Sequence, residues 1–138
     1  MPHFWGEALA RSLPEHGIAY EHLRDLGGFR RPRPDSPNTG WRVDMFRGYA
    51  DNMGSESFRA ALARLERLAE RRRTAIMCAE AQWQRCHRRL TADAFVVRGW
   101  EVCHIRSDGR VERHELTPFA VVDGDRLTYP SEQTSLNL

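Results

Sequence analysis

The sequence predicts an α/β fold: a layered domain with a mostly parallel sheet flanked by helices, followed by a C-terminal β-hairpin. Three short apolar segments, at about residues 18–23, 73–78 and 100–105, have the length and composition of strands. Segments with helical spacing of apolar residues separate them. Strands that alternate with helices are typical of parallel sheets, in which ligands bind at the carboxyl ends of the strands.

The helices are predicted from the spacing of apolar residues and from the residues that start or stop each pattern. Proline ends a helix because it lacks the backbone N–H, glycine commonly follows the last turn, and serine often caps the first. The predicted helices cover residues 4–13 (stopped by Pro14), 44–53, 58–69 (capped by Ser55) and about 85–97 (ended by Gly99).

The remaining segments are predicted to be irregular or to form the hairpin. Residues 31–38 contain three prolines and cannot form regular structure. Residues 121–127 read as two short strands about an Asp-Gly turn. We therefore expect one domain over residues 1–130 and a flexible tail over residues 131–138.

The composition excludes several classes of protein. The chain has 138 residues, of which 41% are hydrophobic and 29% charged, as in ordinary globular domains. No apolar run approaches the roughly 18 residues that a membrane span needs, and no signal peptide is evident. We therefore expect a cytoplasmic protein without a membrane partner. Three cysteines do not resemble a disulfide framework, and a net charge of +2 favours nucleic acid only if the basic residues cluster.

Polar and reactive residues follow the predicted strands. Gly27 and Gly28 come after the first strand, Cys78 ends the second, and His104 lies near the end of the third. Because the ends of parallel strands share one edge of the sheet, we expect these residues to meet there. All 21 basic residues are arginines, whose planar guanidinium groups suit carboxylate or phosphate ligands.

Cys86 is the strongest candidate for reactive chemistry. It lies at a predicted helix start between Arg85 and the pair His87-Arg88, a setting that favours the thiolate and therefore nucleophilic attack. The alternative is a small residue that fits a tight strand–helix junction. Cys78 is either a packing residue or the partner of Cys86 in a reversible disulfide.

Other roles at this place stay open. His87 can act as a base, donate to a ligand or cap the helix. Glu80 can act as a general base or hold Arg85 or Arg88 in position. Cysteines 78 and 86 with the two histidines lack a standard zinc spacing, so we expect neither a metal site nor a cofactor.

Several motifs resemble those of the bacterial and archaeal family called domain of unknown function 488. The similarity runs from about Pro2 to Tyr129, and the motifs agree in order and spacing. It implies an α/β fold with a parallel sheet and a pocket at the Gly-Gly loop, the Cys-Ala-Glu turn and the Cys-His-Arg helix start, but no particular activity. The motifs are Tyr20-x-His22-Leu23, Leu26-Gly27-Gly28, Phe46-Arg47-Gly48-Tyr49-Ala50-Asp51-x-Met53, Met77-Cys78-Ala79-Glu80, Cys86-His87-Arg88, Ala92-Asp93-Ala94 and Glu101-Val102-x-His104-Ile105.

The chain also departs from that family at its start. Members usually begin with a strand–helix–strand unit, whereas this sequence starts after that unit, at Pro2-His3-Phe4. The resemblance therefore implies a shortened domain with exposed sheet edges, which favours self-association.

Three functional hypotheses result, and the residues alone do not decide whether the chain is an enzyme. The first is a protein that binds a small phosphate- or carboxylate-bearing ligand. The second is an enzyme with Cys86 as nucleophile and His87 or Glu80 as base. The third is a nucleic-acid accessory protein that uses Arg30, Arg31 and Arg33 with Trp41. The candidate ligand-binding residues of the first hypothesis are Gly27, Gly28, Arg30, Cys78, Arg85, Arg88 and His104.

Overall fold

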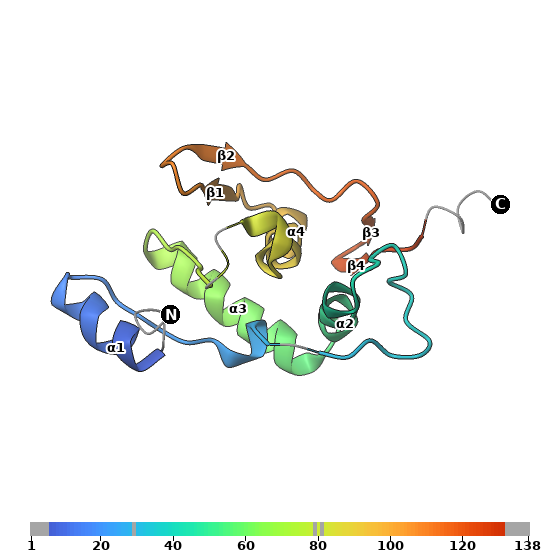
Figure 1. The fold of residues 1–138 in the computed structure, drawn as a ribbon, viewed down its shortest axis with the longest axis horizontal. Helices are drawn as coiled ribbons and strands as arrows, with labels where there is room; N and C mark the ends of the chain where they lie inside the picture. Colours follow the sequence, from blue (N-terminus) through green and yellow to red (C-terminus); the bar gives the residue numbers. More distant parts are fainter. Residues whose placement is uncertain (1–5, 29, 79, 81, 132–138) are drawn as a thin grey trace.

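A computed structural model of the chain describes residues 6–28, 30–78, 80 and 82–131. Four α-helices, two short 3-10 turns and four short strands make up its regular structure (Figure 1). They follow each other as α1 (Gly6–Glu15), η2 (Arg24–Leu26), α2 (Asp44–Asn52), α3 (Glu56–Arg71), η3 (Trp83–Arg85), α4 (Arg88–Val97), β1 (Cys103–Ile105), β2 (Val111–Arg113), β3 (Val121–Asp123) and β4 (Arg126–Thr128).

The predicted parallel sheet is wrong. The strands of the described chain form two separate two-stranded antiparallel sheets, β1–β2 and β3–β4. Residues 18–23 and 73–78 contain no strand, and Ile18, Ile76 and Met77 are 53%, 39% and 50% exposed. An apolar segment becomes a strand only when a neighbour pairs with its backbone groups, and no described segment pairs with these two.

The first of these segments lies along a helix instead of in a sheet. Glu21 accepts two hydrogen bonds from the Arg64 guanidinium of α3, at 3.0 and 2.8 Å. Both side chains are substantially exposed, so this ion pair orients the segment more than it stabilises the fold.

The third predicted strand forms in part, but with a different partner. Only Cys103–Ile105 is a strand, and it pairs antiparallel with Val111–Arg113 across a tight turn. Gly109 supplies the positive φ of +85° that this turn needs. Closing a short hairpin costs less chain entropy than pairing with a distant strand, so the local partner prevails.

The helix predictions are confirmed for three of the four helices. Ser55 caps α3, accepting a hydrogen bond from the Phe58 backbone N–H at 3.2 Å. α4 ends before Gly99, whose φ is +90°, but it begins at Arg88, so Cys86 lies in extended backbone before the helix and not in its first turn as predicted. α1 differs because Pro14 lies inside its last turn, and the first residues of that prediction, at 4 and 5, lie outside the described residues.

Two further predictions, the C-terminal hairpin and the irregular proline-rich segment, are confirmed. The β3–β4 hairpin forms around Gly124, at φ +63°. Residues 31–38 have no helix or strand. Residues 132–138 of the predicted tail lie outside the described residues. Among the described helices, none combines the length and the apolar character needed to cross a membrane.

The core lies where α2, α3 and α4 meet the β3–β4 side of the molecule (Figure 1). Aromatic rings dominate it: the Trp41 ring contacts those of Phe46, Phe119 and Tyr129 at centroid distances of 4.8 to 5.2 Å. The buried members of this cluster are Leu26, Trp41, Phe46, Tyr49, Ala50, Phe58, Ala61, Leu62, Leu65, Leu90, Ala94, Phe95 and Tyr129.

Candidate functional site

Two cysteines from different segments meet just before α4. The Cys78 sulfur lies 2.8 Å from the Cys86 sulfur, and both are free thiols. Cys86 is the extended residue between η3 and α4 and is only 4% exposed, whereas Cys78 is half-buried. A disulfide needs about 2.05 Å between the sulfurs, so a small movement would allow the bond to form.

The two thiols differ in their affinity for a proton. Burial raises the pKa of Cys86, but hydrogen bonds from His87, Cys78 and the Arg88 backbone N–H outweigh burial and lower that pKa to about 6. The pKa of Cys78 is raised, by burial first and then by its hydrogen bond to Cys86. Near neutral pH the pair therefore holds one proton, on Cys78, and one negative charge, on Cys86.

Arg88 connects the cysteine pair to the turn around Glu80. Its backbone N–H lies 3.4 Å from the Cys86 sulfur, and its guanidinium donates to the Glu80 carbonyl oxygen. Its buried Nε has no hydrogen-bond partner among the described residues. The Glu80 carboxylate accepts instead from the Gln82 backbone N–H at 3.1 Å, so Glu80 holds Arg88 through its carbonyl and not through its charge. Arg85 is exposed.

The Gly-Gly turn reaches this neighbourhood through Tyr49. The Tyr49 hydroxyl donates to the Leu26 carbonyl, directly before Gly27, and its ring stacks on His87 at 5.1 Å. Burial, and to a lesser extent the Cys86 charge, raise the pKa of Tyr49, so the phenol stays protonated. Tyr49 therefore links the residue before the glycine turn to His87, the neighbour of Cys86, and this indirect path replaces the predicted meeting at the edge of a parallel sheet.

His104 belongs to a different cluster, built from residues that are buried and polar. Its Nε2 lies 2.7 Å from His114 Nδ1, and His114 Nε2 lies 2.7 Å from Asp93 Oδ1. The Tyr129 hydroxyl donates to the other carboxyl oxygen of Asp93 at 2.8 Å. The Trp83 ring covers the His104 ring in parallel at 3.9 Å.

Trp83 joins this cluster to the thiols. It begins η3, and its carbonyl oxygen accepts from the Cys86 backbone N–H at 3.2 Å. Burial, then the neighbouring His114, lower the pKa of His104 to about 4, so His104 is neutral at physiological pH. A neutral ring under Trp83 gives η3, and therefore Cys86, a fixed support.

Comparison with known proteins identifies a family for this sequence. A family described as "Domain of unknown function DUF488" matches residues 1–95 of the 138. The chain belongs to this family. No curated protein and no solved structure matches the chain. The matched part of this DUF488 protein contains the two thiols and Asp93, whereas His104, His114 and Tyr129 lie beyond it.

Sequence reasoning missed three members of the buried cluster in this DUF488 protein: Asp93, His114 and Tyr129. Asp93 could have been found from the sequence. It is an acidic residue within the apolar run Ala92 to Val97 of α4, and a carboxyl group is buried in such a run only when other groups form hydrogen bonds to it. His114 and Tyr129 gave none, since only the tertiary structure brings them to Asp93.

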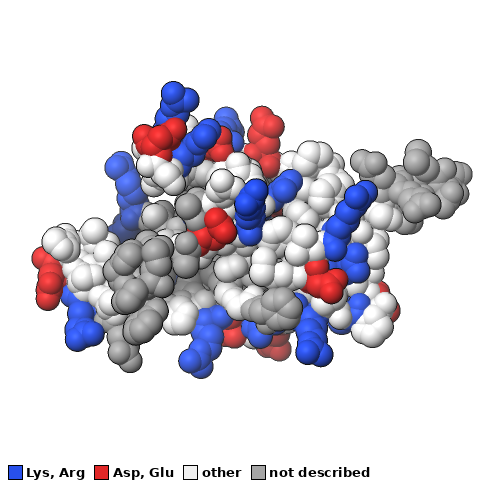
Figure 2. Space-filling model, in the orientation of Figure 1, with Lys and Arg blue, Asp and Glu red and all other residues white. Residues whose placement is uncertain are grey.

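The third functional hypothesis loses its stacking residue. Trp41 is 5% exposed within the aromatic core, and the Arg89 guanidinium lies 5.0 Å from its ring centroid, so no base can reach it. On the face seen in Figure 2, arginine side chains stand apart with acidic side chains between them. Arg30, Arg31 and Arg33 instead line a cavity next to α2, away from the thiols.

Proposed function

We propose that this DUF488 protein carries out thiol–disulfide exchange with a small disulfide, using Cys78 and Cys86. The observation that carries the proposal is the 2.8 Å separation of the two sulfurs, one of which favours the thiolate. A thiolate is the nucleophile of such exchange, and a second thiol within reach completes the reaction.

The difference in exposure assigns an order to the two sulfurs. Cys78 is the more exposed, so it meets the incoming disulfide R–S–S–R′. The Cys78 sulfur attacks this disulfide while the Cys78 proton passes to the Cys86 thiolate. The S–S bond of the substrate breaks, a Cys78–S–S–R bond forms, and R′S⁻ is released. Cys86 then loses that proton to water, because the hydrogen bonds from His87 and the Arg88 backbone N–H still lower its pKa.

The second step closes the protein disulfide. The Cys86 thiolate attacks the Cys78 sulfur, which breaks the mixed disulfide and releases RS⁻. Two electrons have passed from the protein dithiol to the substrate disulfide, and both leaving thiolates are protonated according to their own pKa. A second dithiol of lower potential restores the reduced pair.

The charges around the pair favour a substrate that carries carboxylates. Arg85 is exposed beside Cys86, and the buried Arg88 Nε has no partner in the described part of the chain. Carboxylates accept readily from guanidinium groups. In this proposal the anion-binding residues near Cys86 recognise the carboxylates of the disulfide substrate, so anion binding serves the exchange reaction and is not a separate function.

The test uses reduced protein in a Cys103→Ser background, because Cys103 is exposed on β1 and would form disulfides between molecules. Oxidised glutathione, which is anionic, and cystamine, which is cationic, are added in turn. We expect loss of two hydrogen atoms by intact mass, a Cys78–Cys86 linkage by peptide mapping, and faster oxidation by glutathione disulfide.

Single replacements provide the matched controls. Cys86→Ser is expected to stop at the mixed disulfide on Cys78, and Cys78→Ser is expected to react slowly or not at all because Cys86 is buried. The proposal fails if the Cys103→Ser protein forms no internal disulfide, or if the two cysteines oxidise only to separate mixed disulfides.

A further inference from the structure

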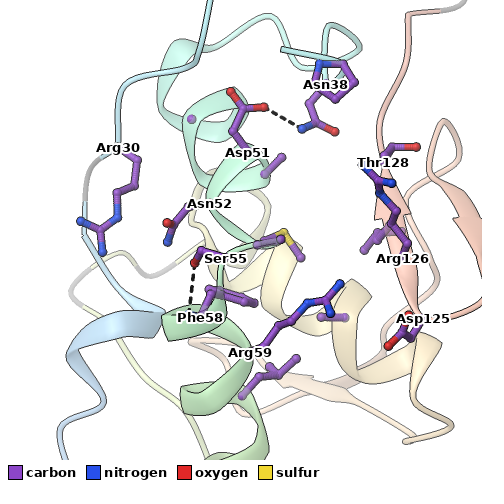
Figure 3. A pocket seen from close by; sticks show the side chains of 18 of the residues that line it. Arg30, Asn38, Asp51, Asn52, Ser55, Phe58, Arg59, Asp125, Arg126 and Thr128 are labelled. Carbon is purple, nitrogen blue, oxygen red and sulfur yellow. Dashed lines mark hydrogen bonds between the residues drawn. The ribbon is translucent and has the colours of Figure 1, made fainter. Parts of the chain in front are cut away.

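A cavity of about 570 Å³ lies between α2, the start of α3, residues 30–38 and the β3–β4 hairpin (Figure 3). This volume is within the range of small-ligand sites. Neither cysteine of the thiol pair lines it, so it is a separate place on the molecule.

The lining of the cavity has an excess of positive charge. Six arginines and two aspartates contribute to it. Asp51 accepts from the Arg33 backbone N–H at 2.8 Å and from the side chains of Ser36 and Asn38 at 2.6 and 2.7 Å. Its carboxylate is thus used to fold the neighbouring loop and does not neutralise a guanidinium inside the cavity.

Two of the six arginines pair with carboxylates outside the cavity. Arg98 pairs with Glu66 at 2.9 Å, and Arg33 pairs with Asp35 at 4.0 Å. In contrast, Arg30, Arg59 and Arg126 form no ion pair with any described carboxylate. Arg59 and Arg126 border the hollow on the same side of α2, together with Asp125, whereas Arg30 lies across that helix from them (Figure 3). Two guanidinium groups that have no ion-pair partner form a place for an anion.

Arg30 is held in position and has a donor to spare. Its backbone carbonyl lies so close to α2 that a Cβ on Gly48 would come within 1.9 Å of it. Its Nε is buried and has no hydrogen-bond partner among the described residues. Its side chain points away from Arg59 and Arg126, so Arg30 borders the cavity without sharing their anion (Figure 3).

Arg59 adds a positive charge to the start of α3. It lies in the first turn of that helix, where the free backbone N–H groups and the helix dipole are already positive, and Glu56 offsets part of this charge. Arg126 lies opposite, on β4, so the two guanidinium groups border the hollow from different elements (Figure 3).

The cavity also has an apolar part. Met53 and Val97, which are both half-buried, contribute to its lining together with the core residues Phe58 and Leu62. A bare inorganic anion would leave this part unused, whereas a ring would cover it. A hollow of about 570 Å³ suits a small molecule better than an extended nucleic-acid strand.

From these features we propose that the cavity binds an organic phosphate: a small molecule with one or more phosphate groups and a ring, such as a nucleoside diphosphate. The phosphate oxygens accept from Arg59 and Arg126, and the ring packs against the apolar part at Met53 and Val97. The site is independent of the thiol pair, so either proposal can fail without the other.

The test is isothermal titration calorimetry at low ionic strength with ADP, pyrophosphate and a short single-stranded oligonucleotide. Arg59→Gln and Arg126→Gln are the test variants, and Arg113→Gln, an exposed arginine on β2 away from the cavity, is the matched control. Losing one charged hydrogen-bond donor weakens binding by about tenfold or more.

We expect ADP to bind more tightly than pyrophosphate, with affinity reduced at least about tenfold in both cavity variants and unchanged in the control. Equal affinity for pyrophosphate and ADP would overturn the role of the ring. Absence of heat with both ligands, equal loss in Arg113→Gln, or binding of the oligonucleotide alone would overturn the site. Arg59 is exposed, so a folded Arg59→Gln protein is expected even if Arg30 variants unfold.

Discussion

Replacing Asp93 by alanine should destabilise the protein more than any other single change in the polar cluster. Asp93 is 0% exposed, and its carboxyl group accepts from His114 Nε2 at 2.7 Å, from the Thr117 backbone N–H at 3.1 Å and from the Tyr129 hydroxyl at 2.8 Å. The replacement leaves three donors in the interior without an acceptor.

The expected magnitude follows from those three donors. Each buried donor left unpaired costs about 1–3 kcal/mol, and partial relaxation makes the sum smaller than the parts, so we expect a loss of about 3–5 kcal/mol. Small domains have a total stability of roughly 5–15 kcal/mol, so the variant should be close to unfolding. Tyr129→Phe removes one donor and keeps the ring, and should cost about 1–2 kcal/mol.

Urea denaturation of the wild type and the two variants, followed by circular dichroism, measures these free energies of unfolding. Asp35→Ala is the matched control. Asp35 is exposed, and its ion pair with Arg33 is weak because the two side chains are 4.0 Å apart in solvent. This replacement should change stability by less than about 0.5 kcal/mol. A cost for Asp93→Ala no larger than that of Asp35→Ala would refute the assignment of Asp93 as the acceptor that holds this cluster together.

Two further predictions concern pH and packing. Because the pKa of His104 is lowered to about 4 in the folded protein from an ordinary value near 6.5, its contribution to stability is complete above pH 6.5 and disappears as the pH falls towards 4. The difference in unfolding free energy between the wild type and His104→Phe should therefore shrink by up to about 3 kcal/mol over this range, and a difference that is constant with pH would contradict the buried neutral imidazole. Gly48→Ala should lower stability by about 1–3 kcal/mol or more, because its Cβ would lie 1.9 Å from the Arg30 carbonyl oxygen. Gly54→Ala, with no atom within 4 Å of the added Cβ, should leave thermal stability almost unchanged, and equal effects of the two would contradict this packing.

The helices could be predicted from the sequence because their determinants are local. The apolar spacing in α3 and its capping by Ser55 involve residues only a few positions apart, as does the stop of α4 at Gly99. Strand pairing depends on a partner that local patterns do not specify. Residues 73–78 therefore look like a strand in sequence and remain an unpaired extended segment in the structure.

The sequence draws attention to the two cysteines and Arg88, but it does not predict how they are arranged. The charged neighbours of Cys86 indicated a reactive thiol, and the structure adds that Cys78 lies beside it. The pairing of Arg88 with a backbone carbonyl could not be predicted, because it depends on the path of the turn. His104 was assigned to the strand-end site, whereas its partners His114 and Asp93 are fixed by tertiary packing.

The ultraviolet absorbance of thiolates, followed against pH in the Cys103→Ser protein, tests the cysteine pair most directly, because it does not require a reagent to reach a buried sulfur. We predict that one thiol per molecule loses its proton near pH 6 and that the second does so above the ordinary thiol value. Cys86→Ser should abolish the low transition. Loss of both protons together near the ordinary thiol value of about 8.5 would contradict the shared-proton pair on which the proposed exchange depends.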